Sequence, residues 1–327
     1  KYLRMAHPSS PFSHTVFSRW YKENEKHFLP PICNKLLSGG QLKIMFCGGK
    51  KANDRGDYHV EDGEEFFYMI RGSMNLKVVE DGKHKNIEIK QGETFLLPAH
   101  IPHSPQRPPN SLGLVIERER LPGEIDAMQW YVKKTGGVAT TDVLWRRTFV
   151  CTDLGKDLVP IVKAYRASEE SKTGEPRPQG AKGEDGKLSI MPLKVPIDEK
   201  TKLPNPINLQ EWVQTATGTQ SKQSSWHKSI YKGSDFHVSV GVCGEGEEKA
   251  VFGPFTSTSE TYYYQLEGSS CLSDQNSAEV KLGPTSMVIV DPMTEHVMSL
   301  QGGGLFVSVS WPTAPEIPKP VGVSSKI

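Results

Sequence analysis

Three side chains in the first third of the chain have the types and spacing of a metal centre: His59, Glu65 and His103. The first two stand in the run from Tyr58 to Glu65, and the third follows an apolar stretch that ends at Pro98. Two imidazoles and one carboxylate hold ferrous iron on three adjacent corners and leave the opposite corners open for a substrate and dioxygen. Neither motif contains cysteine, which disfavours zinc or copper thiolate sites. The sequence therefore predicts a reactive iron centre.

Short strands must bring these residues together. Strand-like runs, separated by Gly and Pro, occur at Leu42–Phe46, Phe66–Ile70, Asn75–Val79, Ile87–Ile89, Thr94–Leu97 and Leu112–Glu117. Asp81-Gly82 between two of them is a hairpin-turn signal. Strands of this length, spaced roughly ten residues apart, indicate a sandwich or barrel. A small barrel brings two ligands that are close in sequence and one that is distant to a single interior point.

Helical spacing is confined to two parts of the first half. Trp20–Phe28 predicts a short helix, and a helical pattern runs from Asp142 to about Ala167. The next segment, residues 168–206, is rich in Pro, Gly, Lys and Glu and is interpreted as a linker or exposed loop. From about Leu209 to Pro312 the chain is again rich in strands.

The second strand-rich region weakly repeats the first. Tyr262–Gly268 echoes Phe66–Gly72 in sequence, and the stretch ending at His296 echoes the one ending at His103. Aligning the two glycines puts Phe255 at the position of His59 and Thr261 at that of Glu65. One retained ligand out of three cannot hold iron well. We therefore predict a catalytic domain at residues 1–167, a linker at 168–206 and a metal-free domain at 207–327.

Composition narrows the class of protein. The formal net charge is +1 and charges are interspersed, so the chain has no large field for nucleic acid or an anionic membrane. Five cysteines without a C-x-x-C pair argue against a disulfide framework. No signal-peptide core or membrane-length apolar run is visible. We expect a cytosolic monomer that binds a small molecule, with neither nucleic acid nor membrane as partner.

The two motifs resemble those of the cupins. The first cupin motif, His-x-His followed by Glu and Gly, is matched by His59, Glu61, Glu65 and Gly72, with Glu61 in the second histidine slot. The second motif is matched by Gly92, Pro98 and His103, with Arg107 in the Asn slot. The resemblance implies an all-β fold of two cupin barrels, each a double-stranded β-helix or jelly roll, with a few peripheral helices.

Longer runs resemble 3-hydroxyanthranilate 3,4-dioxygenases, in their animal-type form with two cupin domains. They are Pro30–Leu36, Asp57–His59, Gly63–Glu65, Phe95–Ala99 and Pro102–Arg107. The resemblance implies Fe(II) as cofactor and an aromatic substrate that carries adjacent hydroxyl and amino groups and a carboxylate. Dioxygen would open the ring to 2-amino-3-carboxymuconate semialdehyde, which closes to quinolinate on the route to NAD.

The same resemblance implies roles for five polar residues. Glu65, Arg107, Glu117 and Asn34 would contact substrate, Arg55 would lie at the dioxygen site, and Arg55 and Glu117 would be catalytic. Glu117 ends the apolar run Leu114–Ile116, where an unpaired charge costs several kcal/mol. A substrate carboxylate would pair with Arg107 in bidentate geometry.

Two other classes remain open from the residues alone. One is a different cupin metalloenzyme, such as a thiol or flavonol dioxygenase or a sugar isomerase. A thiol substrate would not need Arg107 and Glu117, and sugar isomerases usually have a nucleotide-binding face. The other is a non-catalytic bicupin binding protein, a class that usually loses the ligands in both halves.

Overall fold

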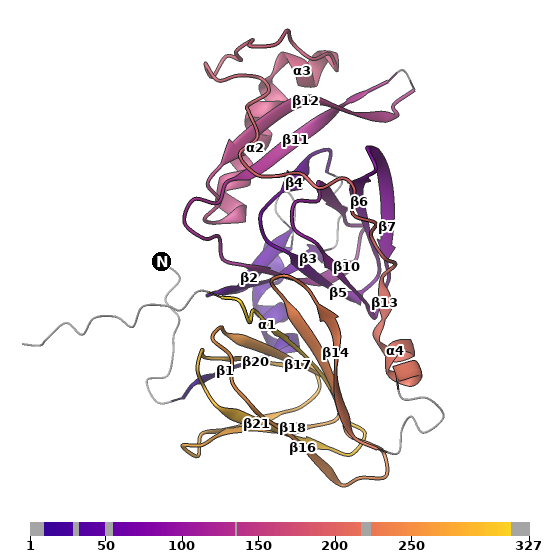
Figure 1. Ribbon diagram of the computed structural model, residues 1–327, viewed down its shortest axis with the longest axis vertical. Coiled ribbons are helices and arrows are strands. Elements are labelled where there is room, and N and C mark those ends of the chain that lie inside the picture. The colour runs from indigo at the N-terminus through magenta and orange to yellow at the C-terminus, as the bar shows by residue number, and fades with distance from the viewer. Residues whose placement is uncertain (1–9, 29–32, 50–54, 135, 217–223, 315–327) are drawn as a thin grey trace, which may run out of the picture. The chain divides into compact units, whose positions relative to one another are not determined.

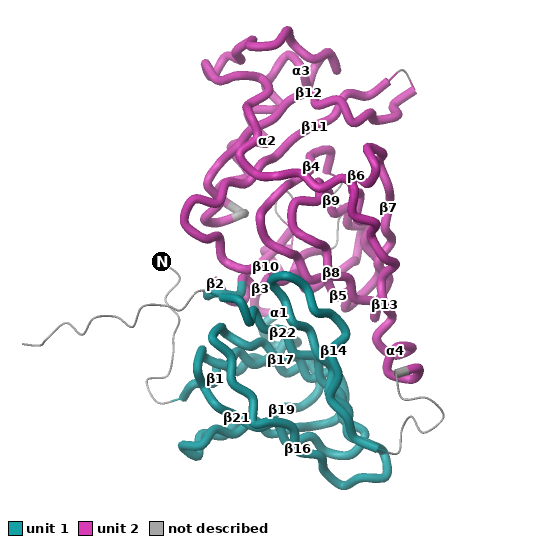
Figure 2. The backbone as a smooth tube through the Cα atoms, in the orientation of Figure 1, with its two compact units in different colours: residues 1–20, 40–42, 219–327 teal, residues 21–39, 43–218 magenta. Residues whose placement is uncertain are grey.

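The computed structural model describes residues 10–28, 33–49, 55–134, 136–216 and 224–314 (Figure 1). Strands dominate, and the chain forms two compact units (Figure 2). Unit 1 comprises residues 1–20, 40–42 and 219–327, and unit 2 comprises residues 21–39 and 43–218. Each unit contains two antiparallel sheets. The predicted class, dominated by strands with a few helices, is confirmed.

Unit 2 contains two six-stranded sheets. The first has the order β13-β8-β5-β10-β3-β2, with β2 at Asn34–Gly39, β3 at Leu42–Gly49, β5 at Glu65–Arg71, β8 at Glu93–Leu97, β10 at Ser111–Arg118 and β13 at Ile207–Asn208. The second has the order β12-β11-β4-β9-β6-β7, with β4 at Tyr58–Val60, β6 at Met74–Glu80, β7 at Lys83–Ile89, β9 at His103–Gln106, β11 at Asp126–Lys133 and β12 at Ala139–Phe149. Side chains of both sheets, among them Phe67, Met74, Leu76 and Val115, pack into one apolar core.

The hairpin predicted at Asp81-Gly82 joins β6 to β7. Both residues have positive φ, 52° and 64°, and Glu80 pairs directly with Lys83 across the two-residue loop. Positive φ at both central positions matches the right-handed twist of the flanking strands, and Gly accepts it without a steric penalty.

The predicted helical pattern from Asp142 is wrong over its first part. Residues Ala139–Phe149 form strand β12, which pairs with β11, and the helix α2 covers Leu154–Ala167. Asp153 caps α2 by accepting a hydrogen bond from the Lys156 N–H. The apolar positions that α2 packs against Trp130 and Trp145 have the predicted 3.6 spacing, whereas the pairing with β11 decides the conformation of the preceding residues.

Three further regions differ from the predicted ranges or add to them: the first helix, segment 168–206 and the helix after β13. The first helix begins earlier than expected, with α1 at Phe17–Asn24 and the short 3-10 helix η1 at Glu25–His27. Segment 168–206 contains helix α3, Glu169–Thr173, and contributes the buried Leu203 to the unit 2 core. Helix α4, Leu209–Ala216, follows β13. The domain boundaries stated above stay predictions.

Unit 1 has a six-stranded and a four-stranded sheet. The larger has the order β1-β20-β17-β22-β15-β14, with β1 at Phe12–Val16, β14 at Trp226–Lys232, β15 at His237–Val242, β17 at Thr261–Glu267, β20 at Ser286–Val290 and β22 at Leu305–Ser310. The smaller has the order β16-β21-β18-β19, with β16 at Lys249–Phe255, β18 at Ser270–Asp274, β19 at Glu279–Leu282 and β21 at His296–Gln301. Strand β1 pairs with β20, so an N-terminal strand completes this unit.

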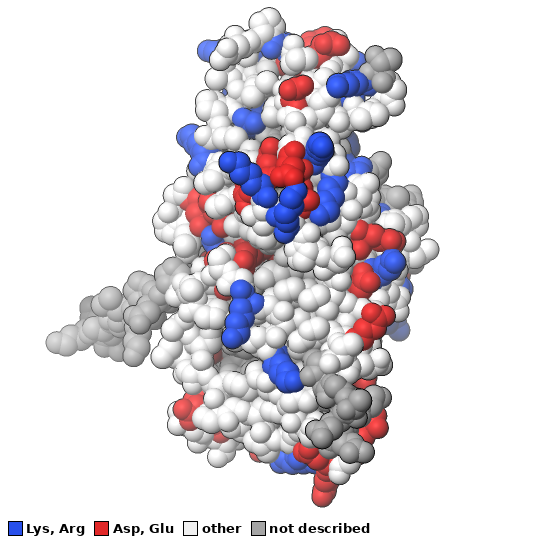
Figure 3. Space-filling model, turned by 45° about the vertical axis from the view of Figure 1, so that its right-hand side comes forward, with Lys and Arg blue, Asp and Glu red and all other residues white. Residues whose placement is uncertain are grey.

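Charged side chains of both signs are interspersed over the face drawn in Figure 3. In the part of the chain that the structure describes, no helix combines the length and the apolar character that crossing a bilayer requires.

Candidate metal centre

The three predicted ligands come from both sheets of unit 2. His59 on β4 lies directly opposite His103 on β9 in one sheet. Glu65 begins β5 in the other sheet, opposite Glu117 of β10. Sheet register thus brings residues that are far apart in sequence to one interior point.

Alternation along each strand decides which side chains enter this interior. In a strand, residues two apart point to the same face. Glu65 and Phe67, His103 and Pro105, and Val115 and Glu117 each share a face in this way. All of them line one pocket, together with Cys33, Asn34, Met45, Cys47, Arg55, His59, Arg107 and Leu158.

Four potential ligand residues gather around one buried point, and three of them, His59, Glu65 and His103, line the pocket. His59, Glu65, His103 and Glu61 are all buried, and each offers one ligand atom within 4.8 Å of those of the others. Within the described residues no other group of three or more His, Cys, Asp or Glu side chains has this geometry. The structure thus brings the three predicted ligands together and adds Glu61 beside them.

One ring nitrogen of each histidine is already held by a neighbour. His59 Nε2 lies 2.7 Å from Asp126 Oδ2, and His103 Nδ1 donates to the Ile101 carbonyl oxygen at 2.9 Å. Such partners fix the ring orientation and the tautomer of a ligating histidine. The other nitrogen of each ring, Nδ1 of His59 and Nε2 of His103, remains for an ion.

The charged groups around the site favour the binding of a cation there. Burial opposes ionisation of Glu65, but His103 Nε2 at 2.9 Å lowers the pKa of Glu65 below its usual range. Burial likewise disfavours a charged His103, yet Glu65 raises its pKa. A metal cation at this point would take the place of the positive charge that Glu65 favours on His103.

The donor set fits a metal that prefers imidazole and carboxylate. Cys47 lines the same pocket, but burial raises the pKa of its thiol to about 11, so it stays protonated at neutral pH. A thiol, unlike a thiolate, is a poor metal ligand. Two histidines and a carboxylate, without a thiolate, are typical of non-haem iron sites with open positions.

Arg107 carries a buried charge that lacks a complete set of partners. The residue is 6% exposed, and its Nη1 has no hydrogen-bond partner among the described residues. Burial lowers the pKa of Arg107. Gly113 makes room for it, since a Cβ at that position would lie 3.3 Å from Nη1 and 2.8 Å from the Met69 sulfur. A buried, incompletely paired guanidinium is a binding site for an anion.

Arg55 and Asn34 occupy different parts of the pocket wall. The Arg55 side chain donates to Asp57 Oδ2 through Nε at 3.0 Å. Its backbone is clamped by Gln106, which accepts from the Arg55 N–H and donates to the Arg55 carbonyl, both at 2.8 Å. Asn34 opens β2 and pairs with Cys47 of β3. Both predicted residues therefore reach the pocket.

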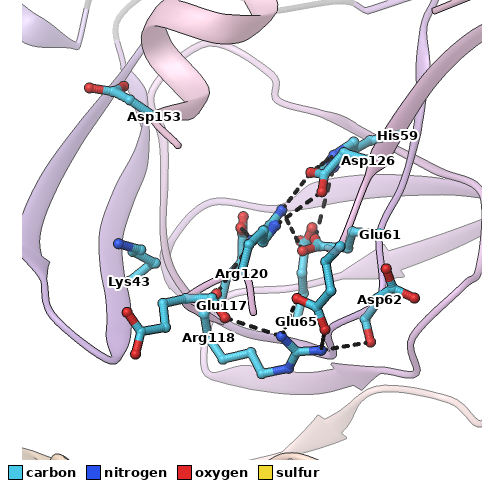
Figure 4. Close-up of polar contacts among 12 residues, drawn as sticks. Lys43, His59, Glu61, Asp62, Glu65, Glu117, Arg118, Arg120, Asp126 and Asp153 are labelled. Atoms are coloured by element: carbon cyan, nitrogen blue, oxygen red, sulfur yellow. Dashed lines mark hydrogen bonds and ion pairs between the residues drawn. The ribbon is translucent and has the colours of Figure 1, made fainter. Parts of the chain in front are cut away.

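Glu117 is paired within the protein by Arg120, a residue that sequence reasoning missed. Arg120 Nη1 lies 2.6 Å from Glu117 Oε2, and Nη2 lies 2.8 Å from Asp126 Oδ2 and 2.5 Å from Glu61 Oε2. Figure 4 shows the guanidinium among these carboxylates. Its signal in the sequence was the charged run 117–120 after an apolar strand. Asp126, also missed, lies 67 residues from His59 in sequence and carries no local pattern.

Comparisons with known proteins show what the chain is similar to. A family model described as 3-hydroxyanthranilic acid dioxygenase matches residues 13–166. The 3-hydroxyanthranilate 3,4-dioxygenase of Xenopus tropicalis is 40% identical over 272 residues, which is 83% of this chain and 89% of that protein. The human enzyme of the same name is 37% identical over 303 residues, which is 93% of this chain and 97% of that protein. A cupin barrel protein from Leptotrichia buccalis has a TM-score of 0.48 at 8% identity, covering 91% of this chain and 96% of that one.

Proposed function

The chain belongs to the 3-hydroxyanthranilate 3,4-dioxygenase family, and from that premise we propose how its residues carry out the reaction. The enzyme joins 3-hydroxyanthranilate and O2, opening the aromatic ring to 2-amino-3-carboxymuconate semialdehyde. We propose that the cofactor is Fe(II) and that His59, Glu65 and His103 hold it.

The observation that carries this proposal is the convergence of three donors beside an unsatisfied cation. His59, Glu65 and His103 form a buried donor set, and Arg107 lines the same pocket with its buried Nη1 unpartnered. A ligand that carries both metal-binding groups and a carboxylate satisfies both features at once. 3-Hydroxyanthranilate has a hydroxyl group and an amino group on adjacent ring carbons and a carboxylate next to the amino group.

Arg107 fixes one end of the substrate. Its guanidinium presents a planar fork of donors, which binds a carboxylate through two parallel hydrogen bonds. Since no described carboxylate pairs with Nη1, binding the substrate removes an existing desolvation cost. This places the ring with its hydroxyl and amino groups toward the donor set. Asn34 at the start of β2 contributes a polar contact at the pocket wall.

Glu117 is placed to handle the substrate's hydroxyl proton. Its carboxylate lies opposite Glu65 across the strand pair, so it faces the same interior point. Burial raises the pKa of Glu117, although Arg120 opposes this. A carboxylate with a raised pKa is a better base near neutral pH. Arg120 holds it in one orientation, so Glu117 accepts the proton or a hydrogen bond at a defined position.

A bound ferrous ion supplies open positions at which the substrate and dioxygen are held together and activated. Arg55 lies on the wall of this space, clamped by Asp57 and Gln106. Its positive charge is suited to stabilise negative charge that develops on oxygen. Leu158 and Phe67 line the same pocket with apolar groups that limit access of water.

The direct test is reconstitution followed by turnover. Metal-free protein is loaded with Fe(II) without oxygen, 3-hydroxyanthranilate and air are added, and the yellow semialdehyde and oxygen uptake are followed together. We expect one O2 consumed per substrate molecule, with Fe(II) and not with Zn(II). Bound iron without colour or oxygen uptake would overturn the proposed chemistry. Equal turnover with zinc would overturn the choice of iron.

A further inference from the structure

The donor cluster contains one carboxylate more than the reaction can use. Glu61 lies with His59, Glu65 and His103 in a group whose ligand atoms are all within 4.8 Å of one another. It occupies the slot that holds the second histidine of the cupin motif, two residues after His59. A substrate that chelates through two groups, plus dioxygen, needs three open positions on a six-coordinate ion. A fourth protein ligand would remove one of them.

Arg120 competes for that carboxylate. Its Nη2 lies 2.5 Å from Glu61 Oε2, and the same nitrogen lies 2.8 Å from Asp126 Oδ2. The Arg120 side chain is 8% exposed, and its Nη1 holds Glu117 at 2.6 Å. A guanidinium in this buried setting makes strong, directed ion pairs. Figure 4 shows Arg120 between Glu61, Glu117 and Asp126.

Glu61 is close enough to serve as a ligand if it were released. Its Oε1 is 3.9 Å from His59 Nδ1, the nitrogen that remains for the ion. Glu61 is 2% exposed, so water does not compete with a cation for its oxygens. Its side chain also has a hydrogen bond with that of Glu65, and Arg120 Nη2, 2.5 Å from Oε2, is the cation that holds one of its oxygens.

We propose that Arg120 is a positioning residue that withholds Glu61 from the metal and so preserves a three-ligand centre with three open positions. The inference rests on the proposed function, because it concerns the same metal. It adds a second role for Arg120, since one guanidinium also fixes Glu117 and the Asp126 partner of His59.

The test measures the coordination of the metal as well as activity. Co(II) replaces Fe(II) as a spectroscopic probe, because the intensity of its visible bands reports the coordination number, and chelator competition gives the affinity. The variants are Arg120→Gln, Glu61→Gln and the double substitution. Arg118→Gln is the matched control: Arg118 is a buried arginine at the end of β10 whose guanidinium pairs with Glu124.

We expect Arg120→Gln to bind Co(II) at least about fivefold more tightly, to change the band intensity, and to lose at least tenfold in turnover with iron. Adding Glu61→Gln should reverse the affinity gain and the spectral change and restore part of the turnover. Arg118→Gln should keep the wild-type spectrum. Weaker Co(II) binding in Arg120→Gln, with no reversal in the double variant, would mean a merely structural role and would overturn the inference.

Two milder variants decide the question if Arg120→Gln fails to fold. Glu61→Gln alone should keep the Co(II) affinity within about threefold, because Glu61 is not a ligand while Arg120 holds it. Glu61→His, which Arg120 cannot hold, should bind Co(II) at least about tenfold more tightly and lose turnover. A tenfold affinity loss in Glu61→Gln, or unchanged affinity in Glu61→His, would overturn the inference. Wild-type protein that binds iron without turnover would instead refute the proposed function.

Discussion

The two barrels place a buried histidine at corresponding points and give it different neighbours. His103 in unit 2 and His296 in unit 1 each begin a strand, and each ring Nδ1 meets the carbonyl oxygen two residues earlier at 2.9 Å. In unit 2 the other nitrogen meets the Glu65 carboxylate at 2.9 Å. In unit 1 it meets the Tyr263 hydroxyl at 2.7 Å. The hydrogen bond from Nδ1 to the backbone is the same in both units, whereas the partner of Nε2 differs.

Strand register supports the equivalence. His59 pairs with His103, and Phe255 pairs with His296, as the sequence alignment predicted. Glu65 pairs with Glu117, and Thr261 pairs with Ser310. Three of the four polar positions around the centre of unit 2 thus carry an aromatic or hydroxyl side chain in unit 1. The scaffold alone does not make a site; charged residues at those register positions do.

Aromatic rings fill the corresponding space in unit 1. Tyr263 and Phe255 lie 5.5 and 5.9 Å from the His296 ring, centroid to centroid, and Phe306 lies 5.7 Å from Tyr263. Such packing buries a histidine with both nitrogens satisfied. In unit 2 the corresponding interior is a pocket with an incompletely paired Arg107. An interior that keeps a polar group without its full set of partners can take up a ligand, whereas the filled interior of unit 1 cannot.

The largest expected difference between the barrels is the effect of removing the equivalent histidine. His103→Ala should abolish stoichiometric iron binding and lower turnover at least about 10³-fold, because the ion loses a ligand. His296→Ala should leave kcat and iron content unchanged below its melting temperature, since His296 contacts only side chains and backbone of unit 1 among the described residues. Metal analysis and oxygen uptake on both variants check this. Equal losses of iron and turnover in the two variants would contradict the proposal that only unit 2 holds the metal.

Substitution of Arg107 should have opposite effects on binding and stability. Arg107→Met should raise KM for 3-hydroxyanthranilate about 30- to 5000-fold, since losing one partner of a buried charge pair costs roughly 2–5 kcal/mol. The substrate-free variant should be at least as stable as wild type, because an incompletely paired buried cation is removed. Steady-state kinetics measure the change in KM, and urea unfolding measures the change in the free energy of unfolding. A destabilised variant with unchanged KM would make Arg107 a structural residue.

Local pattern predicted the metal donors but not the residues that orient them. His59, Glu65 and His103 stand at motif spacing, and the family resemblance pointed to Arg107 and Glu117, which line the same pocket. Asp126 and Arg120 act through strand register and a turn, which no short-range pattern encodes. The same limit explains Ala139–Phe149, where pairing with β11 gives a strand in place of the expected helix. Pairing between strands that are far apart in the sequence cannot be read from a single sequence.

In unit 2 Asp126 contacts the ring of His59, whereas Phe255, at the corresponding position of unit 1, needs no such partner. Substituting Asp126 tests whether this contact orients His59. Asp126→Asn keeps the size of the side chain but cannot stabilise the same His59 tautomer by charge. We expect metal affinity to fall about 10- to 100-fold, as is typical for partners of ligating histidines, with a smaller effect on stability. Chelator competition measures the affinity. Unchanged affinity would show that His59 is oriented by strand packing alone.

The smallest effect concerns the acid stability of unit 1. Burial lowers the pKa of His296, although the Thr294 carbonyl partly opposes this, and the groups that face the ring are the Tyr263 hydroxyl and the apolar rings of Phe12 and Phe255. The unfolded chain then binds a proton near pH 6.5 more readily than the folded one, so stability is full above that pH and declines as pH falls below it. One such group contributes a slope of at most about 1.4 kcal/mol per pH unit.

Urea unfolding at pH 7.5 and 5.5 should show a steeper decline in the free energy of unfolding for wild type than for His296→Gln, which cannot take up the proton. A parallel decline would assign the acid sensitivity to other groups and leave His296 as a packing residue alone.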